Sequence, residues 1–276
     1  MMPIILSGLF IYPIKSAAGI AIEQSTITTR GLEYDRRWMV VGPDGTFMTQ
    51  RKFPKMALIT VKIQSDSLVV QAPDMEPLVV PLKPEQSVLS EYEEPLAYDK
   101  KVVEVWGDRC LGWSMGEAVR SWFSDVLKTP CDLVYMPDTS KRSVDHGKFG
   151  DENQVSFADA YPFLLISEAS LDDLNQRLDQ PVLMNRFRPN LVVSGCDGFA
   201  EDSWKSIQVG NVSFQVSKPC SRCVVTTVDQ STGNRSVEPL KTLATYRHWD
   251  GQIWFGQNLI HEALGKISVG DRIQVL

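Results

Sequence analysis

Hydrophobic and polar residues in the first hundred or so positions follow the short patterns of β-strands. Turn-forming residues separate apolar runs at 4–11, 37–41, 58–63, 68–70, 78–80 and 102–105. Between two such segments, Pro43-Asp44-Gly45 predicts a hairpin, because glycine accepts the positive φ angle that these turns require. The spacing of the runs predicts a β-barrel or sandwich-like half.

A helical pattern follows this β-rich region. Between Met115 and Leu127, apolar residues recur on one face at helical spacing, which predicts an amphipathic helix whose apolar face packs into the core. The next stretch, 129–154, is polar and carries Lys141-Arg142 and the segment 146–150. It predicts a long surface loop near an opening.

The second half combines strands with short helices. A buried strand is predicted at 162–166, and Ser167 follows it as the N-cap of a short helix that carries Leu171 and Leu174. A short helix is also predicted to begin at Pro239. Further strands are predicted at 191–193, 206–216 with a turn at 210–211, 224–228 and 267–275. The expected fold class is mainly β with short helices (α+β), in two interlocked halves.

Composition narrows the functional classes. The net charge of −6 argues against a nucleic-acid binder, although a local basic pocket can still hold a small phosphate. The apolar start from Met1 to Ile14 is broken by prolines and lacks a preceding basic residue, so we expect neither a signal peptide nor membrane association. Five irregularly spaced cysteines favour free thiols in a reducing compartment, and hence a cytoplasmic protein.

The segment 220–223, Cys-Ser-Arg-Cys, is the first candidate for chemistry. It can be a redox pair, half a zinc site or the source of one activated thiolate. A thioredoxin-like pair opens a helix, whereas the β-branched run 224–228 predicts a strand. A zinc site needs further ligands, and Cys196, His248 and His261 are scattered single residues. A thiolate beside Arg222 suits a heavy transition metal, but the spacing alone does not choose.

Three basic segments form the second candidate. They contain Lys15-Ser16, Asp35-Arg36-Arg37 and the stretch 185–190, which includes Arg188. Cations at element ends, next to hydroxyl groups, are what a phosphate-binding site requires. The alternative is that Arg36 and Arg188 only pair with acidic neighbours such as Asp35 and Glu168.

Taken together, these segments resemble the MOSC proteins (molybdenum cofactor sulfurase C-terminal domain), in particular those similar to the mitochondrial amidoxime-reducing component and its bacterial relatives. The resemblance runs nearly end to end and rests on the motifs at 12–16, 35–38, 49–51, 167–171, 187–190, 221–229 and 255–258. It implies an N-terminal β-rich MOSC-associated domain over 1–128, packed with a β-barrel MOSC domain over 129–276.

The resemblance also implies a cofactor and the residues that hold it. The cofactor is the molybdenum cofactor, a molybdopterin that carries molybdenum, bound between the two domains. The implied reaction does not depend on pyridoxal phosphate. Cys223, rather than Cys220, corresponds to the metal ligand and is expected to be catalytic, with Asp159 as a second catalytic residue. His146 and His248 are further candidate proton donors. The implied cofactor-binding residues are Lys15, Ser16, Arg36, Ser167, Arg188, Asn190, Ser221 and Arg222.

The implied activity is a two-electron reduction of small N-hydroxylated compounds, such as amidoximes and hydroxylamines, with loss of oxygen as water. The 276 residues contain no ferredoxin-like run of cysteines, so a separate ferredoxin, flavodoxin or cytochrome-type protein is expected to supply electrons. Two alternatives stay open. One is a carrier that holds the cofactor or sulfur on Cys223 without turnover, and the other is a structural zinc protein.

Overall fold

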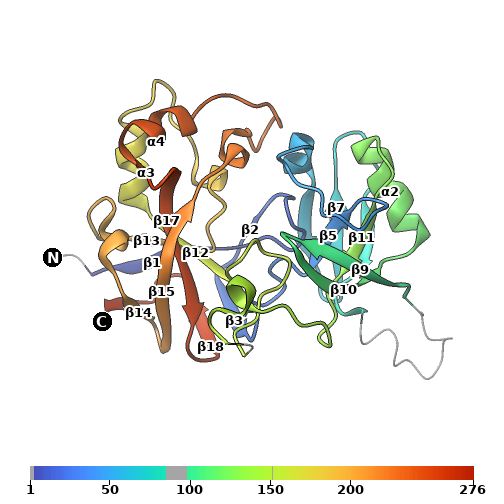
Figure 1. The fold of residues 1–276 in the computed structure, drawn as a ribbon, viewed down its shortest axis with the longest axis horizontal. Helices are drawn as coiled ribbons and strands as arrows, with labels where there is room; N and C mark the ends of the chain where they lie inside the picture. The colour runs from blue at the N-terminus through green and yellow to red at the C-terminus, as the bar shows by residue number, and fades with distance from the viewer. Residues whose placement is uncertain (1–2, 85–97, 151) are drawn as a thin grey trace.

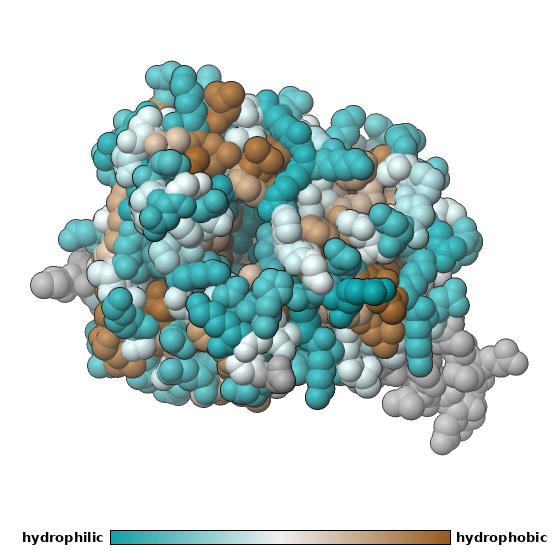
Figure 2. Space-filling model, in the orientation of Figure 1, coloured by the Kyte–Doolittle hydropathy of each residue, from teal (hydrophilic) through white to brown (hydrophobic). Residues whose placement is uncertain are grey.

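The structure of the protein is a computed structural model, which describes residues 3–84, 98–150 and 152–276. Figure 1 shows two halves side by side, and Figure 2 shows that the surface is hollowed between them on this face. Most of the regular structure is strand and the helices are short, which confirms the expected mainly β fold class.

The N-terminal half contains two small sheets that face one another across an apolar core. The strand orders within the described residues are β5-β11-β10-β9 and β6-β7-β8. Helix α2 (Glu117–Leu127) covers the core from one side (Figure 1). The strands are β5 (Trp38–Val41), β6 (Thr60–Ile63), β7 (Ser67–Gln71), β8 (Leu78–Pro81), β9 (Lys100–Val105), β10 (Asp108–Ser114) and β11 (Asp132–Tyr135), and a 3-10 turn spans Pro54–Leu58.

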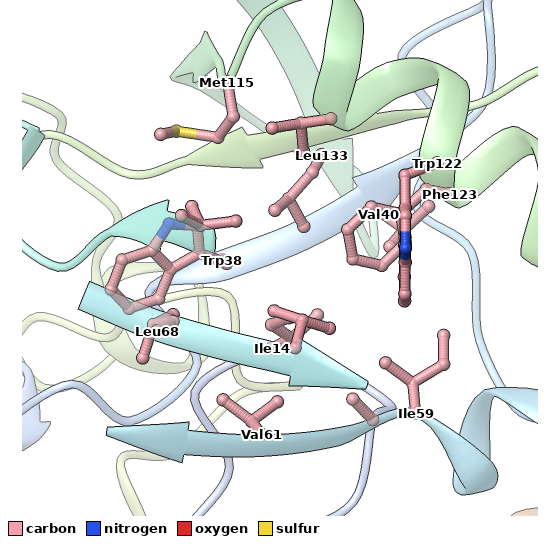
Figure 3. Close-up of a cluster of buried hydrophobic side chains, with 14 of the residues drawn as sticks. Ile14, Trp38, Val40, Ile59, Val61, Leu68, Met115, Trp122, Phe123 and Leu133 are labelled. Carbon is pink, nitrogen blue, oxygen red and sulfur yellow. The ribbon is translucent and has the colours of Figure 1, made fainter. Parts of the chain in front are cut away.

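Large apolar side chains fill the space between these sheets and α2. Trp38 from β5 and Phe123 from α2 are fully buried, and Figure 3 shows them with Leu68 and Leu133 in one cluster. The apolar face of α2 therefore points inward, as the helical pattern predicts. Each such side chain stabilises the fold by roughly 1.5–3 kcal/mol relative to leaving it exposed.

A large sheet dominates the C-terminal half. In the part of the chain that the structure describes, it has nine strands in the order β19-β14-β15-β17-β12-β13-β1-β2, with β16 paired to β17; a second sheet has the order β18-β3-β4. Helices α3 (Glu168–Asn175) and α4 (Leu240–Tyr246) pack on the large sheet through Leu174 and Leu243. The strands are β1 (Ile5–Ile11), β2 (Ile20–Ala21), β3 (Gln24–Thr28), β4 (Gly31–Leu32), β12 (Phe163–Ser167), β13 (Leu191–Ser194), β14 (Ser206–Val209), β15 (Val212–Ser221), β16 (His248–Trp249), β17 (Gln252–His261), β18 (Gly265–Ser268) and β19 (Ile273–Val275).

The two halves exchange segments of chain. Strands β1 to β4, all from the first 32 residues, belong to the sheets of the C-terminal half, where β1 pairs with β13. In the opposite direction, β11 pairs with β5 and β10 in the N-terminal half. A division of the chain at residues 128 and 129 therefore does not separate the halves in space.

Several local predictions are confirmed and others are wrong. The hairpin at 43–45 is present, with Gly45 at φ +80° and a bridge between Val41 and Phe47. The predicted surface loop 129–154 contains the buried strand β11; its residue 151 lies outside the described part. The predicted strand 267–275 is two strands, because Gly270 at φ +92° turns the chain between them.

The predicted strand at 224–228 is also wrong. Residues Val224–Thr227 form a 3-10 turn, in which the hydroxyl groups of Thr226 and Thr227 donate to the carbonyls of Cys223 and Val224. These local hydrogen bonds compete with strand pairing and override the β-propensity of the sequence. The residues after Cys223 therefore do not form the strand that spoke against a thioredoxin-like pair, although Cys220 itself lies in β15.

Candidate functional site

A cleft lies between the two halves and takes its walls from both. It encloses ≈ 870 Å³ of space, part of it open to solvent. The hollow in Figure 2 lies between the same two halves. The lining residues come from seven separate segments of chain: Lys15, Ser16, Arg36, Thr49, Arg51, residues 158–161, Phe163, Leu164, Phe187, Arg188, Asn190, residues 220–223, Val225, Thr226 and Asn258.

Cys223 lies where the chain turns into the cleft. Strand β15 ends at Ser221, and Cys223 is the extended residue that precedes the 3-10 turn Val224–Thr227. Buried Thr226 and Thr227 fix this turn through their hydrogen bonds. The turn therefore holds the partly exposed thiol of Cys223 in the cleft lining, which also includes Cys220.

Arg222 does not lie where the sequence argument placed it. Its Nη1 donates to Sγ of Cys220 at 3.0 Å, and its Nη2 donates to the carbonyl of Phe187 at 2.6 Å. The cation is therefore directed at Cys220 rather than at the expected metal ligand. The Nε of Arg222 is buried and has no hydrogen-bond partner within the described protein. It remains a donor that the protein alone does not satisfy.

The cleft concentrates positive charge in an otherwise acidic chain. Among its described lining residues are five cations, Lys15, Arg36, Arg51, Arg188 and Arg222, and one carboxylate, Asp159. The whole chain carries a net charge of −6. Clustered cations in a concave, partly desolvated site repel one another and attract an anion. The lining therefore fits an anionic ligand, in agreement with the basic motifs of the sequence.

Arg36 and Arg188 are held together by Tyr12. Their guanidinium carbons lie 4.3 and 4.2 Å from the centre of the Tyr12 ring. Arg36 also pairs with buried Asp35 at 2.5 Å, which the sequence offered as an alternative, whereas Arg188 donates to the carbonyl of Ala17 at 2.7 Å. Burial lowers the pKa of Arg188 to about 10. A guanidinium stays protonated at physiological pH, so this shift marks a poorly solvated cation that an anion would stabilise.

Lys15 and Asp159 form an ion pair in the cleft lining. The Nζ of Lys15 lies 2.5 Å from Asp159 Oδ1 and also donates to the carbonyl of Phe157 at 2.7 Å. Burial lowers the pKa of Lys15 to about 8, against the opposing effect of Asp159. Burial alone would raise the pKa of Asp159, but Lys15, Trp106 and Arg51 together lower it well below its usual range.

This ion pair changes the expected role of Asp159. Its side chain is 59% exposed in the cleft, and its low pKa keeps it ionised at neutral pH. An ionised carboxylate accepts a proton and cannot donate one. The two histidines do not replace it, because neither lines the cleft; His146 contacts Asp108 at 2.7 Å and His248 is exposed in β16.

Unusual backbone conformations gather at the cleft. Ser16, Arg36 and Arg188 all have positive φ angles, of 68°, 49° and 57°. Non-glycine residues rarely adopt this region, and each costs on the order of 1 kcal/mol or more. Such strain persists where the surrounding structure holds a side chain in a required direction. All three belong to the cofactor-binding set predicted from the sequence.

Asn190 and Ser167 have different roles in the structure. Asn190 is almost fully buried in the cleft wall, and its Oδ1 accepts from Nη1 of Arg36 at 3.0 Å. It therefore positions a cation. Ser167, by contrast, is fully buried at the start of α3, where its hydroxyl accepts from the backbone N–H of Ser170. It does not line the cleft, so its predicted contact with a cofactor is not supported, while its predicted capping role is confirmed.

Several residues at the site were missed in the sequence. Arg51 and Thr49 follow the confirmed hairpin and line the cleft from the N-terminal half. Arg142, in the predicted surface loop, is buried and donates to the carbonyls of Ser156, Ala158 and Asp159. A polar loop sequence gives no signal that one of its arginines supports a cleft wall.

Two other expectations concern metals and membranes. Across residues 3–84, 98–150 and 152–276, no group of three or more His, Cys, Asp or Glu side chains is placed to hold a metal ion. The structural zinc alternative therefore gains no support from the described residues. No helix in this described part is long and apolar enough to cross a membrane.

Two family models match successive parts of the chain. Residues 4–130 match the MOSC N-terminal beta barrel domain, and residues 152–274 match the MOSC domain. Mitochondrial amidoxime-reducing component 1 is 38% identical in Mus musculus and 36% in Homo sapiens, and each alignment covers 98% of this chain and 82% of the relative. Molybdenum cofactor sulfurase from Oryza sativa subsp. japonica is 34% identical over 93% of this chain and 32% of its own length. The chain therefore belongs to the family of proteins in which a MOSC N-terminal beta barrel domain is joined to a MOSC domain.

Proposed function

We propose that this protein binds the molybdenum cofactor in the cleft and reduces small N-hydroxylated compounds by two electrons. The observation that carries the proposal is the placement of the partly exposed thiol of Cys223, together with five cations, in the lining of one cleft. A thiolate is a soft ligand for a heavy transition metal, and the cations complement a phosphate. The relatives named amidoxime-reducing components supply the substrate class.

The residues of the cleft fit such a cofactor. Cys223 would hold the metal. Arg36 and Arg188, poorly solvated beside Tyr12, would bind the phosphate or pterin together with Lys15 and Ser16. The buried Nε of Arg222 lacks an acceptor within the described protein and would find one on a bound group. Ser221 and Arg222 would lie beside the metal ligand.

The reaction consumes protons as well as electrons. One amidoxime, two electrons and two protons give one amidine and one water. When bound, the cofactor supplies the two-electron chemistry. The chain itself contributes Lys15, whose pKa of about 8 leaves Nζ protonated at neutral pH. Ionised Asp159 accepts a hydrogen bond from this Nζ. Lys15 can therefore hold a proton near the reaction site at neutral pH, while Asp159 stabilises its charged form.

The reaction also needs a source of electrons. We place their source in a separate ferredoxin, flavodoxin or cytochrome-type partner, because the 276 residues contain no iron–sulfur ligand run. A reducing, cytoplasmic setting suits the five free thiols.

The test is asymmetric between the two neighbouring cysteines. Protein produced in a host that makes the cofactor is analysed for molybdenum and pterin, then assayed with a reduced dye and benzamidoxime. We expect Cys223→Ser to lose molybdenum and all measurable turnover, and Cys220→Ser to keep both. Absence of molybdenum and pterin from the unaltered protein would overturn the proposal.

One relative favours a second candidate function. The molybdenum cofactor sulfurase of Oryza sativa subsp. japonica suggests a carrier that holds the cofactor or sulfur on Cys223 without reducing a substrate. Such a carrier would contain molybdenum or pterin, release it readily to an acceptor protein and give no turnover with benzamidoxime. Stable occupancy with turnover would exclude it.

A further inference from the structure

The turn between β9 and β10 places a tryptophan at the rim of the cleft. Val105 pairs with Asp108, so the hairpin loop consists of Trp106 and Gly107 alone. Figure 1 shows this end of the hairpin directed toward the C-terminal half. Trp106 is 44% exposed, although tryptophan has a large aromatic side chain that usually buries much of its area.

Tryptophan is an unusual choice for this turn. Trp106 and Gly107 have φ angles of 54° and 89°, the pattern of a type I′ hairpin, in which asparagine, aspartate and glycine are preferred at both positions. Neither the turn nor the buried core therefore explains the indole. Strained positions of this kind cluster where a side chain serves a ligand.

Three contacts fix the indole against the cleft. Its Nε1 donates to Asp159 Oδ1 at 3.0 Å. The guanidinium of Arg51 lies 4.5 Å from the ring centre, and the ring of Phe47 lies 5.0 Å away at 59°. Asp159 and Arg51 both line the cleft that contains Cys223. A rigid, exposed aromatic surface thus lies against two residues of the cleft lining.

We propose that Trp106 is a specificity-determining residue whose exposed indole stacks on a planar aromatic substituent of the substrate. The proposal rests on the reductase function above and adds the part of the substrate that this chain recognises. Aromatic rings gain from stacking beyond their burial, whereas an aliphatic substituent of similar reactivity does not. The chain should therefore favour aromatic over small aliphatic amidoximes.

Two substrates and two variants test the proposal. Benzamidoxime and acetamidoxime differ in a phenyl and a methyl group. Trp106→Asn suits the turn and removes the indole, whereas Trp106→Phe keeps a ring and removes the N–H donor to Asp159. We expect Trp106→Asn to raise KM for benzamidoxime about fivefold and to leave KM for acetamidoxime within about twofold. Trp106→Phe should keep KM for benzamidoxime within about threefold of the unaltered enzyme.

The contrary results are equally specific. Equal effects of Trp106→Asn on both substrates, or none on either, would overturn the proposal, because the indole would then act through Asp159 or not at all. Trp249→Ala removes an exposed tryptophan whose ring contacts, Arg247 and Trp254, lie outside the cleft lining, and it should change neither KM. If the unaltered protein reduces neither substrate, the proposed reductase function is wrong, whatever the role of Trp106. Calorimetric binding of benzamidoxime without reductant then still decides whether Trp106→Asn weakens binding about fivefold, as we expect, or leaves it unchanged, which would overturn the proposal.

Discussion

The core of the N-terminal half and the cleft between the halves are built on opposite principles. None of the ten core residues labelled in Figure 3 has a positive φ angle, and all are apolar. The cleft instead collects cations and contains three non-glycine residues with positive φ. The difference teaches that the apolar core stabilises the fold, while the cleft is held in a costly conformation suited to binding. Substitutions in the two regions should therefore have separable effects.

The largest effect on stability is expected in the core. Phe123→Ala removes a fully buried ring from α2, and such truncations cost about 3–5 kcal/mol of the free energy of unfolding. Urea unfolding followed by circular dichroism measures the loss. Ser121→Ala, on the exposed side of the same helix, is the control. Loss of cofactor from the folded fraction of Phe123→Ala would contradict the expected separation between the core and the cleft.

The next effect should appear in binding rather than in folding. Arg188→Gln removes a poorly solvated cation, so cofactor affinity should fall about 30- to 100-fold while the free energy of unfolding changes by less than about 1 kcal/mol. Pterin retained after dialysis and urea unfolding of the cofactor-free protein report the two quantities. Arg177→Gln, which removes an exposed ion pair with Asp173, should change neither. If Arg188→Gln lowered the free energy of unfolding as much as Phe123→Ala, the cleft and the core would not be separable in this way.

The smallest expected effect concerns a residue that the sequence placed in the site. Ser167→Ala removes the N-cap of α3 and should cost about 1 kcal/mol of the free energy of unfolding, with no change in cofactor content. Ser16→Ala, in the cleft lining, should show the reverse pattern. Loss of cofactor from Ser167→Ala at unchanged stability would restore the original assignment.

The contacts that the sequence could not supply are those between distant segments. Resemblance identified Lys15, Arg36, Arg188 and Cys223, and all four line one cleft. It could not show that Tyr12 joins two of them, because that contact links residues 176 positions apart along the chain. Trp106 was missed for a similar reason, since a tryptophan in a two-residue turn carries no motif.

Local patterns predicted elements best where packing reinforced them. The helix ending at Leu127 keeps its apolar face because that face fills a core. Within the described part of the chain, the β-branched run after Cys223 pairs only through one bridge, from Val228 to Arg235, so threonine hydroxyl groups decide the conformation of the rest. Strand propensity largely reflects packing against neighbouring strands, so it predicts conformation poorly where such pairing is slight.

The exchange of strands between the halves also constrains how the protein matures. The first 32 residues complete sheets whose other strands lie beyond residue 162, and Asn258 of β17 contributes to the cleft wall. The cleft is therefore incomplete until these later strands have been synthesised. A chain interrupted near residue 128 would leave β1 without β13 and β5 without β11, exposing unpaired strand edges in both fragments. The cofactor that we propose for this cleft would therefore bind only after both halves have folded together.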